Sequence, residues 1–365
     1  MNLINVADYE SAARAKMEPM HFGYYASGAD DEITLHENRE AYRRLQLQYR
    51  VLKGVGKPDL STKLLEHDLS MPLILAPTAL HRLAHPDGEL ATVRAAGTAG
   101  TLMMLSTLSS TPLEDVMDAA GGPLWFQLYI YKDRGITESL VRRAMAAGFG
   151  ALVVTVDAPV MGRREADERS GFEPPPGVTL ANLSKVGVER LQSAGGSSLA
   201  EYVAAQLKPD LSWGDIDWLA SITALPVLVK GVVHPEDAAA GMDRGVAGIV
   251  VSNHGGRQLD TAPATIDVLP EIAEVLDNRV PIIVDGGVRR GTDALKALAL
   301  GADAVAVGRP VLWGLAVDGE EGASRVLGIL REELERAMLL CGAGRLTDLT
   351  PDLVLGSSRL RDPGG

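Results

Sequence analysis

The sequence predicts an α/β protein in which a single domain, residues 1–365, forms a (β/α)8 TIM barrel. Eight short apolar runs alternate with stretches of helical pattern, and eight βα units favour a closed barrel over an open sheet. Most runs are continuously apolar, as expected of parallel strands buried on both faces. The runs are residues 72–76, 101–105, 124–128, 151–156, 226–230, 248–252, 281–285 and 304–308.

Glycines mark the points at which a predicted helix gives way to the next strand. Gly148, Gly245 and Gly301 each follow a helical stretch and precede an apolar run. Glycine suits this place because it adopts the left-handed conformation that ends many helices. The predicted helices are residues 87–96, 137–147, 235–240 and 291–300.

Two segments fall outside this alternation. Residues 1–70 are predicted to be a mostly helical N-terminal extension of the barrel. Residues 160–212 form a loop insertion after the fourth strand that is too long for an ordinary βα connection. This insertion contains Pro174–Pro176 and Gly195–Ser198, so part of it is expected to be mobile.

The composition limits the partners of the protein. A net charge of −13 does not suit nucleic acid or an anionic membrane surface, and no apolar run approaches the ~18 residues of a membrane span. Neither end carries a recognisable signal peptide or peroxisomal address, so we expect a cytoplasmic protein. The one cysteine, Cys341, lies in an apolar run and is interpreted as a buried thiol.

Polar and charged residues gather where the predicted strands end. A barrel places its active site at the carboxyl ends of its strands, and here those ends carry arginines, a lysine, a histidine and hydroxyl groups. The opposite ends carry mostly glycine, alanine and proline. The polar ends are Pro77–Ala79, Ser106–Leu108, Tyr129, Asp157, Arg163, Arg164, Lys230, Asn253–Arg257, Gly286–Arg289 and Arg309.

The loops after the seventh and eighth strands both combine glycine with arginine. Gly286, Gly287 and Arg289 follow the seventh strand, and Gly308 and Arg309 follow the eighth. Glycines let backbone N–H groups approach phosphate oxygens, and arginine adds charge-assisted hydrogen bonds. The glycines alone could form tight turns, but their pairing with arginine in both loops favours a phosphate site.

His254 is the candidate general base, because imidazole titrates near neutrality and glycines beside it leave it open to a ligand. The alternative is a structural histidine, and the strand-end position beside Arg257 favours the catalytic interpretation. No spacing of histidine, cysteine and carboxylate residues indicates a metal site. The other histidines, His21, His36, His67, His81, His85 and His234, are interpreted as surface or packing residues.

Arg164 and Arg257 are candidates for bidentate binding of a carboxylate, with a surface salt bridge as the alternative for either one alone. Lys230 ends an apolar strand, so its amine should emerge in the pocket. Such a lysine can form a Schiff base, or it can act as a fixed cation beside a cofactor.

Several motifs in fixed order resemble the FMN-dependent 2-hydroxy-acid oxidase family, most of all its glycolate oxidase members; the family also contains lactate oxidase and mandelate dehydrogenase. The resemblance runs from about residue 3 to about residue 350. The matching motifs are residues 24–29, 76–79, 126–129, 155–157, 162–167, 228–231, 252–260 and 285–291.

The resemblance implies FMN as the cofactor and assigns roles to named residues. His254 would be the base, oriented by Asp157, and Tyr129 would approach the substrate hydroxyl. Tyr24, Leu108, Tyr129, Arg164 and Arg257 would bind the substrate. The residues implied to bind FMN are Pro77, Thr78, Ala79, Ser106, Gln127, Tyr129, Thr155, Lys230, Ser252, Asp285, Gly286, Gly287, Arg289, Gly308 and Arg309.

The implied reaction is oxidation of a small L-2-hydroxy acid to the 2-oxo acid, with O2 reduced to hydrogen peroxide. Ala79 matches the oxidases of the family, whereas Leu108 stands where glycolate oxidases carry tryptophan, which indicates a substrate larger than glycolate. The resemblance also implies a homotetramer. Alternatives are a dehydrogenase passing electrons to a quinone or other acceptor, a Schiff-base barrel, and an FMN-binding protein without activity.

Overall fold

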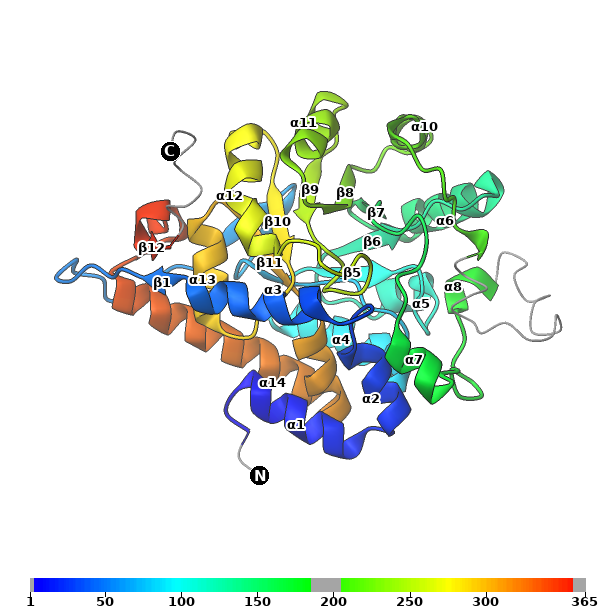
Figure 1. Ribbon diagram of the computed structural model, residues 1–365, viewed down its shortest axis with the longest axis horizontal. Helices are drawn as coiled ribbons and strands as arrows, with labels where there is room; N and C mark the ends of the chain where they lie inside the picture. Colours follow the sequence, from blue (N-terminus) through cyan, green and yellow to red (C-terminus); the bar gives the residue numbers. More distant parts are fainter. Residues whose placement is uncertain (1–2, 185–204, 357–365) are drawn as a thin grey trace.

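The computed structural model describes residues 3–184 and 205–356, and its centre is a closed barrel of eight parallel strands (Figure 1). Each strand overlaps one of the eight predicted apolar runs, so the predicted barrel is confirmed. The strands are β4 (Leu73–Leu75), β5 (Met103–Ser106), β6 (Leu124–Leu128), β7 (Leu152–Thr155), β8 (Val227–Val232), β9 (Gly248–Val251), β10 (Ile282–Asp285) and β11 (Ala304–Val307).

The barrel closes where β11 pairs in parallel with β4, with Val305 beside Leu73. Alternate strand residues point inward and form a separate interior cluster, which includes Ile74, Met104 and Val153. Their neighbours point outward and pack under the surrounding helices. This two-sided burial explains why the strands are apolar along their whole length.

Helices surround the barrel, and the four predicted helices are all present. Four others, α5 (Leu113–Asp118), α10 (Trp213–Ser221), α12 (Thr265–Leu276) and α14 (Arg309–Cys341), follow strands for which no helix was predicted. The long α14 is interrupted by non-helical backbone at Asp318 and Gly319. The surrounding helices are α4 (Gly88–Thr98), α5 (Leu113–Asp118), α6 (Arg134–Ala147), α10 (Trp213–Ser221), α11 (Pro235–Asp243), α12 (Thr265–Leu276), α13 (Gly291–Ala299) and α14 (Arg309–Cys341).

The N-terminal extension is helical only to Arg44, so the prediction of a mostly helical segment to residue 70 is wrong for its last third. Beyond that point a hairpin forms, and its Leu64 and Leu69 join the interior cluster at the amino end of the barrel. The elements are α1 (Val6–Lys16), α2 (Pro19–Ala26), α3 (Ile33–Arg44), β1 (Gln46–Leu47), β2 (Thr62–Leu64) and β3 (His67–Leu69). A short strand, β12 (Val354–Leu355), pairs with β1.

The described part of the insertion after β7 contains two short helices, α7 (Glu165–Ser170) and α8 (Ala181–Ser184). Asn182 is fully buried and ties α8 to the loop after β5 through the Leu113 N–H, the Thr107 carbonyl and the Ser109 hydroxyl. Gly195–Ser198, where mobility was predicted, lies outside the described residues. Within residues 3–184 and 205–356, three 3-10 turns are also present, η1 (His81–Leu83), η3 (Leu346–Asp348) and η4 (Pro351–Leu353).

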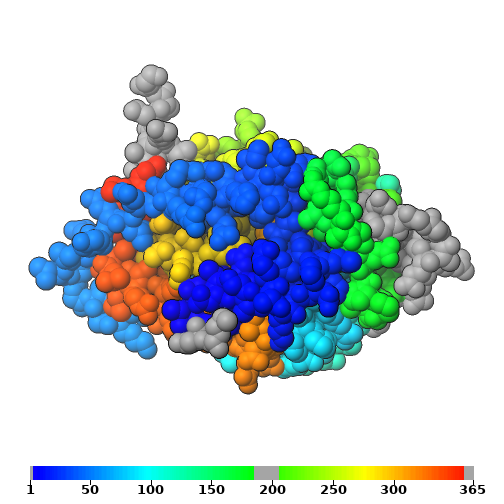
Figure 2. Space-filling model, turned by 60° about the horizontal axis from the view of Figure 1, so that its bottom comes forward, coloured from blue at the N-terminus to red at the C-terminus, as the bar shows by residue number. Residues whose placement is uncertain are grey.

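Figure 2 shows the blue N-terminal segments spread over one face of the molecule, beside the green segment that contains α7. Asp260 accepts hydrogen bonds from the first backbone N–H groups of α3, and Asn38 pairs with Asn253. These contacts attach the N-terminal helices to the loop after β9. Cys341 is buried, as predicted. Among the described helices, none is long and apolar enough to cross a membrane.

Candidate functional site

A cavity of about 1010 Å³, including its open mouth, lies at the carboxyl ends of the strands and is lined by nearly every predicted site residue. Asp157 and Ser252 are the exceptions, since they lie behind His254 and Lys230. The predicted residues on the wall are Tyr24, Pro77, Thr78, Ala79, Ser106, Leu108, Gln127, Tyr129, Thr155, Arg164, Lys230, His254, Arg257, Asp285, Gly286, Gly287, Arg289, Gly308 and Arg309.

Sequence reasoning missed several apolar wall residues. Met161 lies three residues before Arg164 in the loop after β7, and that spacing is the one signal that could have found it. Leu312 reaches the cavity from the first turn of α14, which no motif indicated. The remaining missed residues are Tyr25, Ala76, Ala306, Val307 and Pro310, whereas Gly255 and Val288 lie within the predicted strand-end segments.

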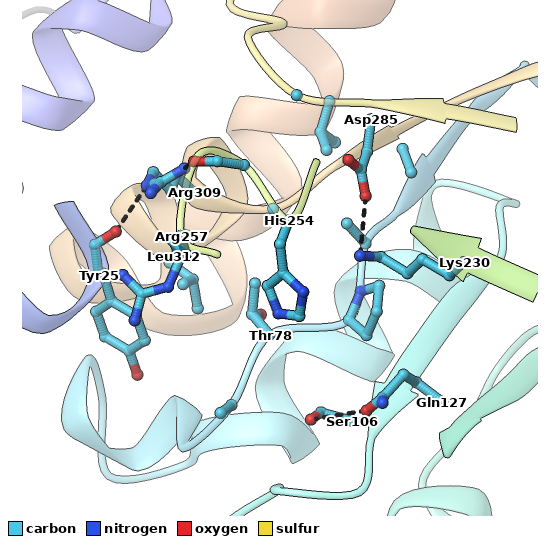
Figure 3. Close-up of a pocket in the computed structure, with 18 of the residues that line it drawn as sticks. Tyr25, Thr78, Ser106, Gln127, Lys230, His254, Arg257, Asp285, Arg309 and Leu312 are labelled. Atoms are coloured by element: carbon cyan, nitrogen blue, oxygen red, sulfur yellow. Dashed lines mark hydrogen bonds and ion pairs between the residues drawn. The ribbon is translucent and has the colours of Figure 1, made fainter. Parts of the chain in front are cut away.

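His254 is held by two contacts on one side of the cavity. Its Nδ1 lies 2.9 Å from Asp157 Oδ1, and its backbone N–H donates to the Ser252 hydroxyl at 3.1 Å. The residue adopts a left-handed backbone, with φ of 59°. Among the described residues, only Nδ1 of the ring has a hydrogen-bond partner, so Nε2 is free to meet a ligand. Figure 3 shows the ring between Arg257 and Lys230.

Burial and charge set the protonation of this pair. Burial lowers the pKa of His254 below its usual value, and it outweighs the neighbouring Asp157 carboxylate, which acts in the opposite direction. Burial alone would raise the pKa of Asp157, but His254 and Lys230 hold it below its usual range. The ground state is therefore a neutral imidazole facing the cavity, backed by an ionised carboxylate. That is the protonation a general base needs.

Lys230 lies on the opposite side of the cavity from Arg257, as Figure 3 shows. The amine is almost fully buried, donates to Ser252 at 2.9 Å and lies 3.5 Å from Asp285. Gln127 donates to the Thr155 hydroxyl at 2.9 Å on the neighbouring strand. This wall therefore offers a cation and a row of amide and hydroxyl groups that can bind the polar edge of a cofactor ring.

The arginines of the cavity bind backbone carbonyls and not carboxylates. Arg257 donates to the Tyr24 and Ser27 carbonyls, and Arg309 to those of Tyr25, Ser27 and Gly255. Within residues 3–184 and 205–356, no carboxylate forms a salt bridge with Arg164, Arg257, Arg289 or Arg309. The site thus gathers positive charge that the described protein does not neutralise, which is the electrostatic signature of an anion site.

Burial affects the titration of these groups. It lowers the pKa of Arg257 to about 10, and Arg164 adds to the effect. It also raises the pKa of Tyr129, so the phenol keeps its proton and can donate it in a hydrogen bond. The guanidinium of Arg257 also lies 5.2 Å from the centre of the Tyr24 ring. One end of the cavity therefore holds two arginines and a phenolic donor.

The other end has the shape of a phosphate cradle. Gly286 and Gly287 have φ of 97° and 83°, and a side chain at Gly287 would come within 1.9 Å of the Asn38 carbonyl. Gly308 and Arg309 line the same cavity at the point where α14 begins. Arg289 Nε is a buried donor without a partner among the described residues. The arginine donors, the glycine backbone and the unpaired positive charge at this end of the cavity all fit the phosphate of a flavin mononucleotide.

The barrel carries three features at one end: a glycine cradle with arginines, a row of polar groups beside a buried lysine, and a histidine–aspartate pair. Together they define an oxidoreductase whose cofactor bears a phosphate group. The family model described as FMN-dependent dehydrogenase matches residues 13–355. The chain belongs to this family and is an FMN-dependent enzyme, which confirms both the resemblance and the cofactor predicted from the sequence.

Individual relatives agree with the family assignment. The chain is 50% identical to glycolate oxidase 3 of Oryza sativa subsp. indica over 363 residues, covering 99% of both chains. It is 50% identical to an L-lactate oxidase of Nostoc sp. over 351 residues, covering 95% of this chain and 96% of the relative. Among solved structures, a mandelate oxidase superposes with a TM-score of 0.89 at 41% identity, covering 95% of this chain and 97% of that one.

Proposed function

We propose that the protein oxidises an L-2-hydroxy acid to the 2-oxo acid and passes the electrons to O2. The single observation that carries this proposal is His254, hydrogen-bonded to Asp157, in the same cavity as Arg164 and Arg257, which form no ion pair with a described carboxylate. A substrate carboxylate supplies the missing anion, and an adjacent hydroxyl-bearing carbon supplies the proton. The relatives named glycolate oxidase, L-lactate oxidase and mandelate oxidase act on acids of this kind.

In this proposal Arg257 and Arg164 grip the substrate carboxylate, because a planar guanidinium binds two oxygens at once. Tyr24 and the protonated Tyr129 line the same end of the cavity and donate to the carboxylate and the 2-hydroxyl oxygen. Two such anchors fix the orientation of the α-carbon. Fixed orientation selects one enantiomer, which the family resemblance gives as L.

His254 Nε2 takes one proton from the bound acid, and Asp157 stabilises the imidazolium that results. Bound FMN supplies the acceptor for the two electrons that leave the α-carbon. The product is the 2-oxo acid, and the electrons then reduce O2 to hydrogen peroxide. Lys230 contributes a fixed positive charge on the wall where negative charge accumulates.

Ala79 supports O2 as the electron acceptor. It lines the cavity in the loop after β4, and the resemblance connects alanine at this place with oxidases. The alternative, transfer to a quinone or another acceptor, predicts a reduced enzyme that persists in air and is reoxidised quickly by that acceptor.

Leu108 supports a substrate larger than glycolate. It lines the cavity, as the apolar Met161 does, and it is a leucine at the position where the resemblance gives tryptophan in glycolate oxidases. Apolar contact is worth about 0.8 kcal/mol per buried CH2, or roughly fourfold in affinity. Each added substrate carbon that reaches this wall should raise kcat/KM by about that factor.

Hydrogen peroxide release across a panel of acids tests the proposal. The panel contains glycolate, lactate, 2-hydroxyoctanoate and mandelate, each chiral acid in both enantiomers. We expect peroxide from the L forms, none from the D forms, and the highest kcat/KM for an acid longer than glycolate. Leu108→Trp should reverse the size ranking, and Leu113→Met, at a buried position off the cavity, serves as the control. Peroxide from none of these acids would refute the proposal.

A further inference from the structure

His81 lies directly behind the loop Pro77–Leu80 that lines the cavity. It opens η1, is 2% exposed, and is hydrogen bonded through both ring nitrogens. Its Nε2 lies 2.5 Å from the hydroxyl of Thr78, which is itself a wall residue. The interpretation as a surface or packing residue thus missed a polar role, because its partners Thr78 and Thr92 carry no motif.

The surrounding hydrogen bonds determine which nitrogen carries the proton. The Thr92 hydroxyl donates its one hydrogen to the Gly88 carbonyl at 3.2 Å. With its hydrogen on Gly88, this hydroxyl accepts from His81 Nδ1–H, and the two atoms lie 2.9 Å apart. On a neutral ring Nε2 then has no hydrogen and can only accept. The Thr78 hydroxyl accordingly donates to His81.

The ring stays neutral in this environment. Burial lowers the pKa of His81 and prevails over the nearby Glu89 carboxylate. Glu89 is itself fully buried and already accepts from the His81 and Ser110 N–H groups and from the Ser110 and Thr111 hydroxyls. Four hydrogen-bond donors already satisfy the Glu89 carboxylate. It therefore does not need an ion pair with a protonated His81 ring.

We propose that His81 is a positioning residue that holds the Thr78 hydroxyl proton away from the cavity. Thr78 lines the cavity, so a bound FMN would meet a hydroxyl that can accept a hydrogen bond but not donate one. Reduction converts an acceptor nitrogen of the flavin ring into an N–H donor. A fixed acceptor on the wall therefore favours binding of reduced over oxidised FMN. The inference rests on the FMN site and is independent of the substrate.

The test is the ratio of the affinities for reduced and oxidised FMN, measured as the two-electron reduction potential in anaerobic dye equilibration without any hydroxy acid. His81→Phe frees the Thr78 hydroxyl to donate to the oxidised ring. One neutral hydrogen bond corresponds to about a fivefold change, so we expect the ratio to fall by about that factor. His81→Gln, whose amide oxygen can accept from Thr78, should restore it.

A double-mutant cycle separates this role from a structural one. In a Thr78→Val background, His81→Phe should change the ratio no further, because the hydroxyl is gone. Thr101→Val removes a buried hydroxyl bonded to the Leu73 carbonyl, outside the FMN cavity, and controls for destabilisation alone. If His81→Phe does not fold, His81→Asn replaces it, since the shorter side chain cannot reach Thr78. An unchanged ratio, or an effect that persists in Thr78→Val, would overturn the proposal.

Discussion

The two ends of the barrel differ in what fills them. At the amino end the β2–β3 hairpin inserts Leu64 and Leu69 against Ile74 and Trp125, and all four side chains are buried in one apolar cluster. At the carboxyl end a large cavity is lined by arginines, a lysine and a histidine. The chain itself fills the amino end. The carboxyl end is built to bind an anionic ligand.

This difference separates stability from activity. Close packing at the amino end lowers the free energy of the folded state directly. Arginines without carboxylate partners at the carboxyl end raise the free energy of the folded state, and FMN should offset that cost by mass action when it binds. Variants at the amino end should therefore lower stability and leave activity unchanged. Variants at the carboxyl end should lower activity with the fold intact.

The largest effect is expected for His254→Asn. Loss of a general base should lower the rate of flavin reduction by about 10²- to 10⁴-fold, with FMN still bound. The measurement is anaerobic stopped-flow reduction at saturating substrate. The matched control is His67→Asn, because His67 lies at the amino end beside Trp125, with 6.3 Å between ring centroids. A near-normal rate in His254→Asn would remove this residue from the mechanism.

Leu64→Ala should show the opposite behaviour. Leu64 is 1% exposed at the amino end, and loss of such a side chain costs about 2–5 kcal/mol in the free energy of unfolding. The urea midpoint of the FMN-loaded protein reports this loss. The value of kcat/KM below the transition should not change. A fall in kcat/KM of the same size would show that the two ends are not independent.

Arg257→Lys should produce a smaller loss that is confined to activity. A lysine cannot bind two carboxylate oxygens in a plane, so roughly 1.5–3 kcal/mol of charge-assisted bonding is at risk, or about 10- to 150-fold in kcat/KM. Arg163→Lys is the control, because Arg163 is exposed and pairs with Glu165 and Glu168. Equal kinetics for the two variants would make Arg257 peripheral to substrate binding.

The pH profile should show the smallest effect. The pKa of His254 lies below 6.5, so it remains a base down to slightly acid pH, and kcat/KM should fall only below about pH 6.5. Asp157 raises the pKa of His254, so Asp157→Asn should move this acid limb to lower pH while lowering the plateau. A limb that moves to higher pH would contradict the assigned pair.

Because the pKa of His254 is lowered in the folded protein, the free energy of unfolding should also depend on pH. Below about pH 6.5 the unfolded chain protonates this histidine before the folded protein does. The free energy of unfolding contributed by His254 is therefore fully present above that pH and is lost as the pH falls toward the folded-state pKa.

The comparison of the two ends also shows what the sequence could predict. Strand positions and strand-end residues such as His254, Lys230 and Arg289 follow from periodicity, since a barrel brings all carboxyl ends to one side. The hairpin at residues 62–69 was missed, because its strands are three residues long and too short to show alternation.

Contacts between distant segments could not be predicted. Arg257 donates to the Tyr24 carbonyl across 233 residues, and no local pattern encodes that pairing. His81 acquires its role from a hydroxyl three residues away and another on α4, so it resembles any buried histidine in sequence. Met161 and Leu312 are ordinary apolar residues until the fold turns them toward the cavity.

The central claim is that the carboxyl end of the barrel binds FMN and an L-2-hydroxy acid so that His254 can begin the oxidation. Anaerobic mixing of the FMN-loaded protein with the two enantiomers of mandelate, followed by the absorbance of oxidised flavin, tests it most directly. We predict rapid and complete bleaching with the L acid and none with the D acid. Persistent flavin colour with both enantiomers of mandelate and of lactate would contradict the claim.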